Sequence, residues 1–397
     1  GLVHKLRGEK SNRQPDAQLK SQVLEIYATK YADYGPTLAA ECLNSEDDLQ
    51  VPVQTLRRWL LSAGLWQRQR RRKVHRRRRP RKEHFGELIQ MDGSIHDWFE
   101  GRRGEAVLMV MIDDATSRIY ARFFERETLA AAWTTFRAWA ERYGLPRALY
   151  VDRHSIYRSD KEPTAEQLLA GEEPPTQFGR SMHQLDVRLI KARSPQAKGR
   201  VERMNGTLQD RLVKAMRRAN ISDLESANRF LEEGFLEPFH QQFMVTAAQE
   251  GDLHRPLEAT CDLDRILSVQ EERVVQNDWT VRWRNRFLQL SRSAAQHVQP
   301  GDVVTICEPL TGALRVFSQE EELTWSTSPE DVPRSLSEPA KASVEIRTSQ
   351  GQRPAADHCW RRFRLPGSHP PRPPELAGSA PDSLRSSCAT PANSEVS

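Results

Sequence analysis

Three short segments near the start of the chain carry apolar residues at helical spacing. They cover residues 17–31, a stretch that follows Pro36, and residues 53–63. Gly64 comes after the third segment, at the position where a glycine commonly ends a helix. Three short helices with this ending predict a helix-turn-helix domain over 1–65. A small helical bundle with a charged surface is the alternative.

The pattern changes to runs of strand length at about residue 85. Apolar runs separated by turn residues predict strands at 86–94, 105–113, 118–124, 148–152 and 187–191. A helix opened by Thr128 lies between the third and fourth runs, and a helix opened by Ser194 and Pro195 follows the fifth. Elements in this order predict a mixed α/β domain over 84–250.

Short alternating runs replace this pattern near the C-terminal end. Residues 262–325 contain about five of them, among them 280–284 and 303–306, and together they predict a small all-β barrel. From 326 to 397 serine, proline and charged residues dominate and the periodicity is lost. This composition predicts a disordered tail.

Composition limits the class of protein. The 397 residues, 38% of them hydrophobic, suffice for two or three domains with apolar cores. The longest apolar run, 106–112, is too short to cross a bilayer, and no signal peptide is visible. The five cysteines are scattered without a CxxC pair, which argues against a disulfide framework or a cysteine-rich zinc site. We expect a cytoplasmic protein. The first residue is glycine rather than methionine, so the completeness of the N-terminus stays open.

Positive charge is concentrated in one short stretch. Residues 66–82 contain eleven Lys or Arg in seventeen positions, whereas the whole chain has a net charge of only +5. A run this dense is not expected to be buried, and we interpret 66–83 as a basic linker. Its expected partner is the phosphate backbone of a nucleic acid. Nuclear localisation and binding to a membrane surface are the alternatives.

Three acidic residues lie at positions suited to a shared site. Asp92 ends the first predicted strand of the α/β domain, Asp152 ends the fourth, and Glu202 follows near the start of the next helix. Glu202 stands beside Val201 at the edge of that helix's apolar stripe, so packing holds it while its carboxylate faces a cleft. Three other acids of this domain, Asp97, Asp113 and Asp114, are rival candidates for the site. We expect the adjacent Asp113 and Asp114 to shape a turn and Asp97 to lie in the loop after the first strand.

Two strand-borne aspartates followed by a helix-borne glutamate resemble the metal ligands of RNase H-like nucleotidyl transferases. The residues around Glu202, read as Pro195-Gln196, Gly199 and Met204-Asn205, are similar to the corresponding helix of retroviral integrases. The chain therefore resembles an insertion-sequence DDE transposase of the ISNCY type with an integrase catalytic core. Glu202 follows Asp152 by 50 residues, more than in retroviral integrases, and we attribute the excess to an insertion at 160–179.

The resemblance implies an activity, a cofactor and partners. It implies an RNase H-like core that cleaves DNA 3′ ends and joins them to target DNA with two Mg²⁺ ions, for which Mn²⁺ can substitute. Asp92 would bridge both ions, and Asp152 and Glu202 would each complete one site. The partners would be double-stranded DNA, as transposon ends and target, and further copies of the chain in a homodimer or higher multimer. We expect no membrane partner and a location in the bacterial cytosol, associated with the nucleoid.

Several side chains are candidates for contacts with DNA. On the exposed face of 53–63 they are Gln54, Thr55, Arg57 and Arg58. In the basic linker they are Arg70, Arg71, Arg72, Lys73, Arg76, Arg77, Arg78 and Arg79. At the start of the Glu202 helix they are Lys198 and Arg200, where the helix dipole also attracts phosphate. The C-terminal barrel is expected to contact DNA or a second protomer, with a purely structural role as the alternative.

Two residues near the acidic trio have open roles. His154 either approaches the scissile phosphate or is a hydrogen-bonded loop histidine, and Asn205 either orients a ligand carboxylate or touches DNA. Two other functions also stay open. One is a non-catalytic DNA-binding protein derived from a transposase, and the other is an RNase H-superfamily nuclease that cuts without joining.

Overall fold

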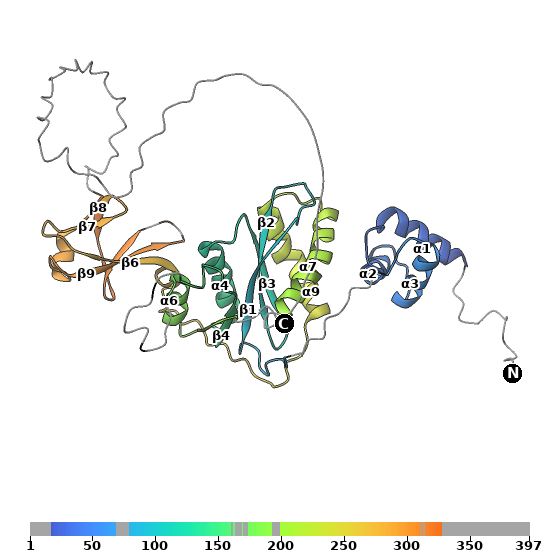
Figure 1. Ribbon diagram of the computed structural model, residues 1–397, viewed down its shortest axis with the longest axis horizontal. Helices are drawn as coiled ribbons and strands as arrows, with labels where there is room; N and C mark the ends of the chain where they lie inside the picture. Colours follow the sequence, from blue (N-terminus) through green and yellow to red (C-terminus); the bar gives the residue numbers. More distant parts are fainter. Residues whose placement is uncertain are drawn as a thin grey trace, which may run out of the picture. The chain divides into compact units, whose positions relative to one another are not determined.

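A five-stranded mixed sheet forms the centre of the α/β region in the computed structural model (Figure 1). The structure describes residues 17–68, 79–159, 162, 169, 174–192, 199–310, 312 and 314–327. The strands are β1 (Ile89–His96), β2 (Ala106–Asp113), β3 (Ile119–Phe124), β4 (Ala148–Val151) and β5 (Arg188–Lys191), and their order across the sheet is β3-β2-β1-β4-β5. β1, β2 and β3 are antiparallel neighbours, while β4 and β5 run parallel to β1.

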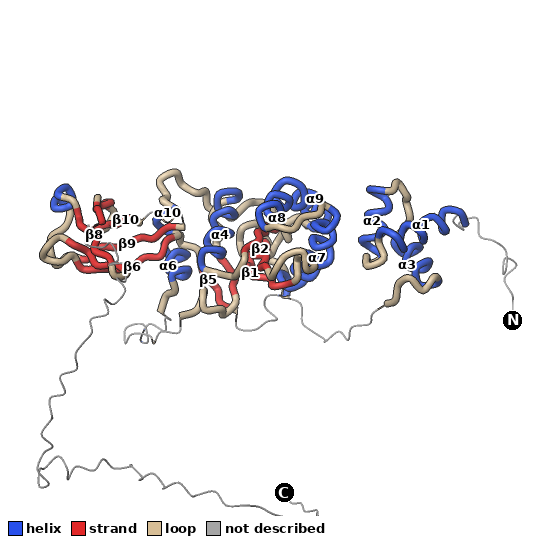
Figure 2. The backbone as a smooth tube through the Cα atoms, turned by 90° about the horizontal axis from the view of Figure 1, so that it is seen from above, coloured by secondary structure: helices blue, strands red, loops and turns tan. Residues whose placement is uncertain are grey.

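Helices cover both faces of this sheet (Figures 1 and 2). α4 (Leu129–Tyr143) packs on β2 and β3 from one side, and α7 (Gly199–Arg218) packs on β1 and β2. β2 is buried along its whole length because both of its faces are covered. The mixed α/β class and the predicted order of elements are confirmed, and the order is the one expected of an RNase H-like core.

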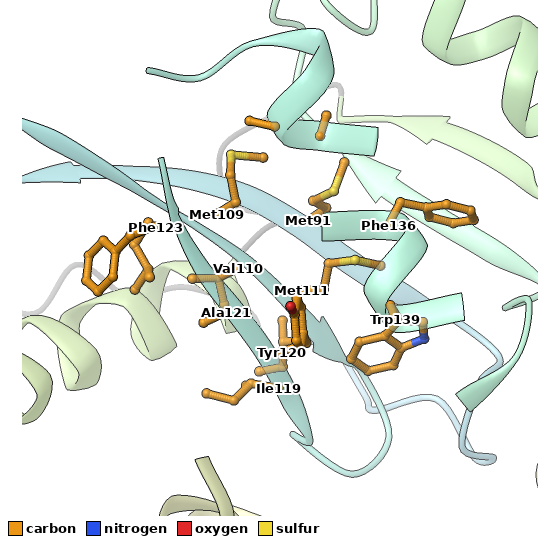
Figure 3. Packing of buried hydrophobic residues seen from close by; sticks show 14 of the residues in the cluster. Met91, Met109, Val110, Met111, Ile119, Tyr120, Ala121, Phe123, Phe136 and Trp139 are labelled. Atoms are coloured by element: carbon orange, nitrogen blue, oxygen red, sulfur yellow. The ribbon is translucent and has the colours of Figure 1, made fainter. Parts of the chain in front are cut away.

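The alternation of side chains along β1 and β2 separates the two faces. Met91 pairs with Met111 across the strands, and both lie near Phe136 and Trp139 of α4 (Figure 3). Asp92 pairs instead with Val110, so its side chain points to the opposite face, where α7 lies. Met91 thus packs into the apolar core on the face of the sheet that α4 covers, whereas the side chain of Asp92 lies on the face that α7 covers.

Local signals set the limits of α4. The side chain of Thr128 accepts a hydrogen bond from the backbone N–H of Ala131, as an N-cap does. At the other end Gly144 has a φ of +97°, and a Cβ there would lie 2.6 Å from the carbonyl oxygen of Arg255. Glycine is therefore required by conformation and by space.

Among the described residues, one further helix lies between β4 and β5 and the others follow α7. They are α6 (Gln177–Gln184), α8 (Leu224–Phe230), a π-helical turn (Leu231–Phe235), α9 (Leu236–Phe243) and the short α10 (Leu263–Ile266). Asp223 caps α8 by accepting from the N–H of Ser226. α8 continues through the π turn into α9, so one bent segment covers β3.

Three helices form the N-terminal part as the sequence predicts. They are α1 (Ala17–Lys30), α2 (Pro36–Glu46) and α3 (Val53–Ser62), and they share a core of their own. Tyr27 is buried in that core and donates a hydrogen bond to the carbonyl of Tyr34 at 2.8 Å. Gly64, with a φ of +70°, follows α3 where a helix end was expected.

Seven strands in two sheets form the C-terminal β region, for which the sequence predicts a barrel of about five strands. One sheet contains β6 (Ser268–Val274), β9 (Val303–Pro309), β10 (Arg315–Ser318) and β11 (Glu321–Leu323). The other contains β7 (Thr280–Trp283), β8 (Arg286–Leu290) and β12 (Trp325–Thr327). A 3₁₀ turn (Arg292–Gln296) connects β8 towards β9, and one apolar cluster joins both sheets. The predicted tail from 326 on, apart from the end of β12, lies outside the described residues.

His240 of α9 is buried against β3, where the N–H of Ile119 lies 3.2 Å from Nε2. Burial lowers the pKa of His240, and the positive charges of Arg118 and Arg142 lower it as well. The unfolded chain therefore takes up this proton first as the pH falls below about 6.5. The free energy of unfolding, measured by urea denaturation between about pH 7.5 and pH 5, should decrease in that range. The decrease should be smaller in His240→Gln and unchanged in His183→Gln, an exposed control on α6.

Candidate active site

Parallel pairing of β1 and β4 brings two of the predicted acids together. Ile89 lies opposite Leu149 and Gln90 opposite Tyr150, an offset of sixty residues that Asp92 and Asp152 also have. Neighbouring strands are about 4.8 Å apart. Asp92 in β1 and Asp152 directly after β4 are both half-buried. The two carboxylates therefore stand side by side at the carboxyl end of β4.

One face of α7 is fixed to β1 by two side-chain hydrogen bonds. Asn205 Nδ2 donates to Asp92 Oδ2 at 3.0 Å, and Gln209 Nε2 donates to Ser94 Oγ at 3.2 Å. Glu202, Asn205 and Gln209 follow the spacing of a single helical face. The third predicted acid, which is exposed, thus lies on the side of α7 that faces Asp92.

The structure assigns roles to the two residues left open. Asn205 orients a carboxylate, and its Oδ1 is buried without a hydrogen-bond partner among the described residues. The backbone N–H of His154 donates to Asp152 Oδ1 at 2.9 Å, and its Nδ1 lies 3.4 Å from the N–H of Ile156. His154 is therefore a hydrogen-bonded loop histidine that helps to hold Asp152. Within the described ranges, no group of three or more Asp, Glu, His or Cys side chains is close enough to hold a metal ion.

A fourth carboxylate beside Asp92 was missed by sequence reasoning. A Cβ added to Gly93 would lie 2.5 Å from Glu127 Oε2, so the Glu127 carboxylate rests against the strand next to Asp92. The buried Tyr157 lies close to the same acids. Burial raises the pKa of the Tyr157 phenol well above its usual value, and the negative charges of Glu127, Asp152 and Asp92 raise it further. The only sequence signal for this arrangement is the glycine that follows Asp92.

Asp114 is fully buried and binds groups from three segments. Its carboxylate accepts from Gln90 Nε2 at 2.7 Å, from Arg200 Nε at 2.8 Å and from the backbone N–H of Lys82 at 2.8 Å, and it also pairs with Arg79. We call this set, Asp114 with Arg79, Lys82, Gln90 and Arg200, the Asp114 cluster.

Gln90 extends the Asp114 cluster into the first turn of α7. Its Oε1 lies 3.4 Å from the backbone N–H of Val201, the residue before Glu202. Arg200 NH2 also donates to the carbonyl of Arg79 at 3.1 Å. The end of the basic linker and the start of the Glu202 helix thus both bind the buried carboxylate of Asp114.

Asp113 ends β2 and Asp114 begins the turn that follows, as predicted for these two acids, but only the Asp113 side chain forms hydrogen bonds within that turn. Asp113 Oδ1 accepts from the N–H and the hydroxyl of Thr116, each at 2.7 Å, and Oδ2 accepts from the N–H of Gly86 at 3.1 Å. The Asp114 carboxylate instead accepts hydrogen bonds from the donors of the Asp114 cluster. Asp97 lies in the connection after β1, as expected, and accepts from the N–H of Gly101 at 3.1 Å.

The predicted DNA-binding side chains fall into three groups. Gln54, Thr55, Arg57 and Arg58 lie on α3, with Arg57 bonded to Gln54 at 3.0 Å and Arg58 to Thr55 at 3.5 Å. Arg79 and Arg200 belong to the Asp114 cluster, where both guanidinium groups pair with the buried Asp114; the Arg79 side chain is exposed and the Arg200 side chain is largely buried. The others lie outside the described residues: Arg70, Arg71, Arg72, Lys73, Arg76, Arg77, Arg78 and Lys198.

No model of a known protein family matches the chain. It is 36% identical over 367 residues to the protein named "Putative transposase y4bF" of Sinorhizobium fredii, covering 89% of this chain and 78% of that protein. It is also 36% identical over 222 residues to the transposase for insertion sequence IS1202 of Streptococcus pneumoniae, covering 54% of this chain and 44% of the relative. The chain belongs to the transposase family. Its recognition from sequence as an insertion-sequence transposase of the DDE type is confirmed.

Solved structures of retroviral integrases are also similar. A simian T-cell lymphotropic virus intasome in complex with a PP2A regulatory subunit has a TM-score of 0.33 and 14% identity, covering 77% of this chain and 99% of that chain. The catalytic core of BIV integrase has a TM-score of 0.25 and 19% identity, covering 40% of this chain and 99% of that chain.

Among the described residues, no helix is both long and apolar enough to cross a membrane.

Removal of the Asp114 charge should strongly destabilise the core. In Asp114→Asn the guanidinium of Arg200, whose side chain is 13% exposed, loses its buried partner. We expect the free energy of unfolding to fall by about 3–5 kcal/mol in urea denaturation. The control, Glu225→Gln, removes an exposed acid paired with Arg229 and should cost about 0.5 kcal/mol or less. Equal losses in the two variants would contradict the structural role of Asp114.

A methyl group on Gly93 should disturb the site without unfolding the protein. In Gly93→Ala the new Cβ displaces the flexible end of Glu127, so the melting temperature should change little. Transposition of a marked element in cells should fall on the order of a hundredfold, the scale of a 1 Å misplacement near reacting groups. Gly206→Ala, on an open face of α7 where a Cβ meets nothing within 4 Å, is the matched control. Normal transposition by Gly93→Ala would show that the position of Glu127 does not matter.

Proposed function

We propose that this chain is a DDE transposase that binds the terminal repeats of its insertion sequence and catalyses metal-dependent 3′-end cleavage and strand transfer. The observation that supports the proposal is that Asp92, Asp152 and Glu202 belong to elements that pack against one another, namely β1, the end of β4 and α7. The register of β1 and β4 sets Asp92 beside Asp152, and the hydrogen bond from Asn205 to Asp92 turns the Glu202 face of α7 towards them. Membership in the transposase family supports the same reading.

The donor set suits a hard divalent cation. Asp92, Asp152 and Glu202 offer only carboxylate oxygens, the ligands that Mg²⁺ prefers, and the unpartnered Oδ1 of Asn205 is a further oxygen beside Asp92. We infer that the three acids hold two Mg²⁺ ions, with Mn²⁺ as a substitute. When bound, such ions activate the attacking oxygen and stabilise charge on the leaving oxygen in an in-line displacement at phosphorus.

The chain's own residues position the reacting groups, because the proposed chemistry needs no side-chain nucleophile. Water first attacks the phosphorus at the transposon end, and the P–O bond to the 3′ oxygen breaks, releasing a 3′-OH. That hydroxyl then attacks a phosphorus of the target strand and displaces another 3′ oxygen. Asn205 and the backbone of His154 keep Asp92 and Asp152 in fixed orientations during both steps. The Tyr157 phenol stays protonated, because its pKa is raised.

We assign DNA recognition to the parts around this core. A helix-turn-helix domain over 1–65 would read the terminal repeats with Gln54, Thr55, Arg57 and Arg58, and the linker 66–83 would bind phosphates together with Lys198. The core would span 84–250, the β region 262–325 would contact DNA or a second protomer, and 326–397 would be a disordered tail. Two DNA ends must be joined in one complex, so we propose a homodimer or higher multimer acting in the cytosol on the nucleoid.

A strand-transfer assay tests this function. The substrate is duplex DNA carrying the repeats that flank the gene, with Mg²⁺ or Mn²⁺. Wild type should give joined products that EDTA abolishes, and Asp92→Asn, Asp152→Asn and Glu202→Gln should reduce them to background. Asp97→Asn removes an acid of the same domain that lies in the loop after β1, and it should remain active.

Two other results would overturn the proposal. Cleavage without joining by the wild-type protein would identify an RNase H-superfamily nuclease. Binding to the repeats with no metal-dependent chemistry would identify a DNA-binding protein derived from a transposase.

A further inference from the structure

A cleft of about 1530 Å³ runs along the edge strand β5, outside the group of carboxylates. Its walls come from both ends of β4, from α6 and β5, and from the segment 252–256. Figure 2 shows α6 and β5 next to one another. The lining is rich in arginine, and these arginines come from four separate segments of the chain.

The two acids of the cleft each lie beside a basic side chain. Asp186 lies 3.5 Å from the Arg255 guanidinium, and Asp252 Oδ1 lies 2.6 Å from His254 Nδ1. Arg180 has a local role too, because its guanidinium donates to Gln184 at 2.7 Å and burial lowers the pKa of this group to about 10. These groups therefore form local contacts within the wall, and Arg180 adds positive charge there, because a pKa of about 10 leaves it protonated at neutral pH.

Four arginines remain on the lining. They are Arg147, Arg153, Arg158 and Arg188; all are exposed, and none forms an ion pair with an acid in the described part of the chain. Like charges held together without counter-charges repel each other and raise the local potential. An anionic ligand relieves that repulsion, so the cleft is suited to a polyanion.

The arrangement of these arginines suggests which polyanion fits. Arg153 is the residue after Asp152, at the carboxyl end of β4, whereas Arg147 and Arg188 stand at the other end, where the N–H of Arg188 donates to the carbonyl of Arg147 at 3.0 Å. The four residues of β5 span about 13 Å. One strand of duplex DNA carries about four phosphates over that length, at about 3.4 Å each.

We propose that this cleft is a third DNA-binding surface, distinct from α3 and the basic linker, which holds the phosphate backbone of duplex DNA as it leaves Asp152. The proposal rests on the function proposed above, because it takes the ligand to be the DNA on which the carboxylates act. Contacts to phosphates carry no sequence information, so the cleft accepts transposon-end DNA and unrelated target DNA alike.

The salt dependence of DNA binding tests the cleft without any catalysis. Fluorescence anisotropy in EDTA gives the slope of log K against log[salt] for wild type and for the double variant Arg147→Gln/Arg188→Gln. We expect the slope to become less steep by about 1.8, because each lost phosphate contact removes about 0.9. The control, Arg103→Gln/Arg229→Gln, changes the net charge equally at two ion-paired positions outside the cleft and should leave the slope unchanged.

Further arms make the outcome decisive. Arg147→Lys/Arg188→Lys keeps both charges and should retain the wild-type slope, and equal melting temperatures show that the variants fold. If the slope of the Gln variant changes equally on duplexes with and without the terminal repeat, the cleft binds both transposon-end and target DNA. If the slope changes on one duplex alone, the cleft binds only that kind of DNA. A slope for the Gln variant equal to that of the control overturns the proposal. If wild type shows no strand transfer while the slope still changes, the proposed function fails and the cleft stands.

Discussion

The buried carboxylate of Asp114 is the constraint on which the catalytic region depends. A charge without exposure to water is tolerated only when donors surround it, and here these are two guanidinium groups, an amide and a backbone N–H. Those donors come from the end of the basic linker, from β1 and from the first turn of α7. Because one acid must satisfy all three segments at once, the start of the Glu202 helix has little freedom to shift or to rotate relative to the sheet.

A small number of contacts also positions the acids of the carboxylate site. Asp92 and Asp152 need no long-range side-chain bond to meet, because the parallel register of β1 and β4 sets them side by side. Only Glu202 depends on tertiary packing, and α7 is held at two points on one face, by Gln90 at its start and by Asn205 one turn later. In the described part of the chain, Asn205 Oδ1 and the Tyr157 hydroxyl are buried near these acids without a hydrogen-bond partner.

Sequence reasoning succeeded where the signal was local. Thr128 and Gly144 limit α4 through capping and a positive φ, and the periodicity of α7 follows from its burial against the sheet. It failed where a residue acts over a long distance in the chain. Asp114 lies in the predicted turn, but nothing near it in sequence reveals partners of its carboxylate that lie 32 and 86 positions away. Glu127 and the cleft arginines are isolated in the same way, since only the folding of separate segments brings them together.

The distribution of positive charge shows why cation density alone is a poor guide to DNA contacts. Arg79 and Arg200 stand in or near dense basic stretches, yet both are bound to Asp114. Arg147 and Arg188 stand alone in sequence, yet they lie exposed together at one end of the β5 edge. A guanidinium that already neutralises a buried acid must give up that partner to bind a phosphate, whereas an unpaired one displaces only counterions. The cations best prepared to bind DNA are therefore those for which the fold supplies no acid, wherever they occur in the sequence.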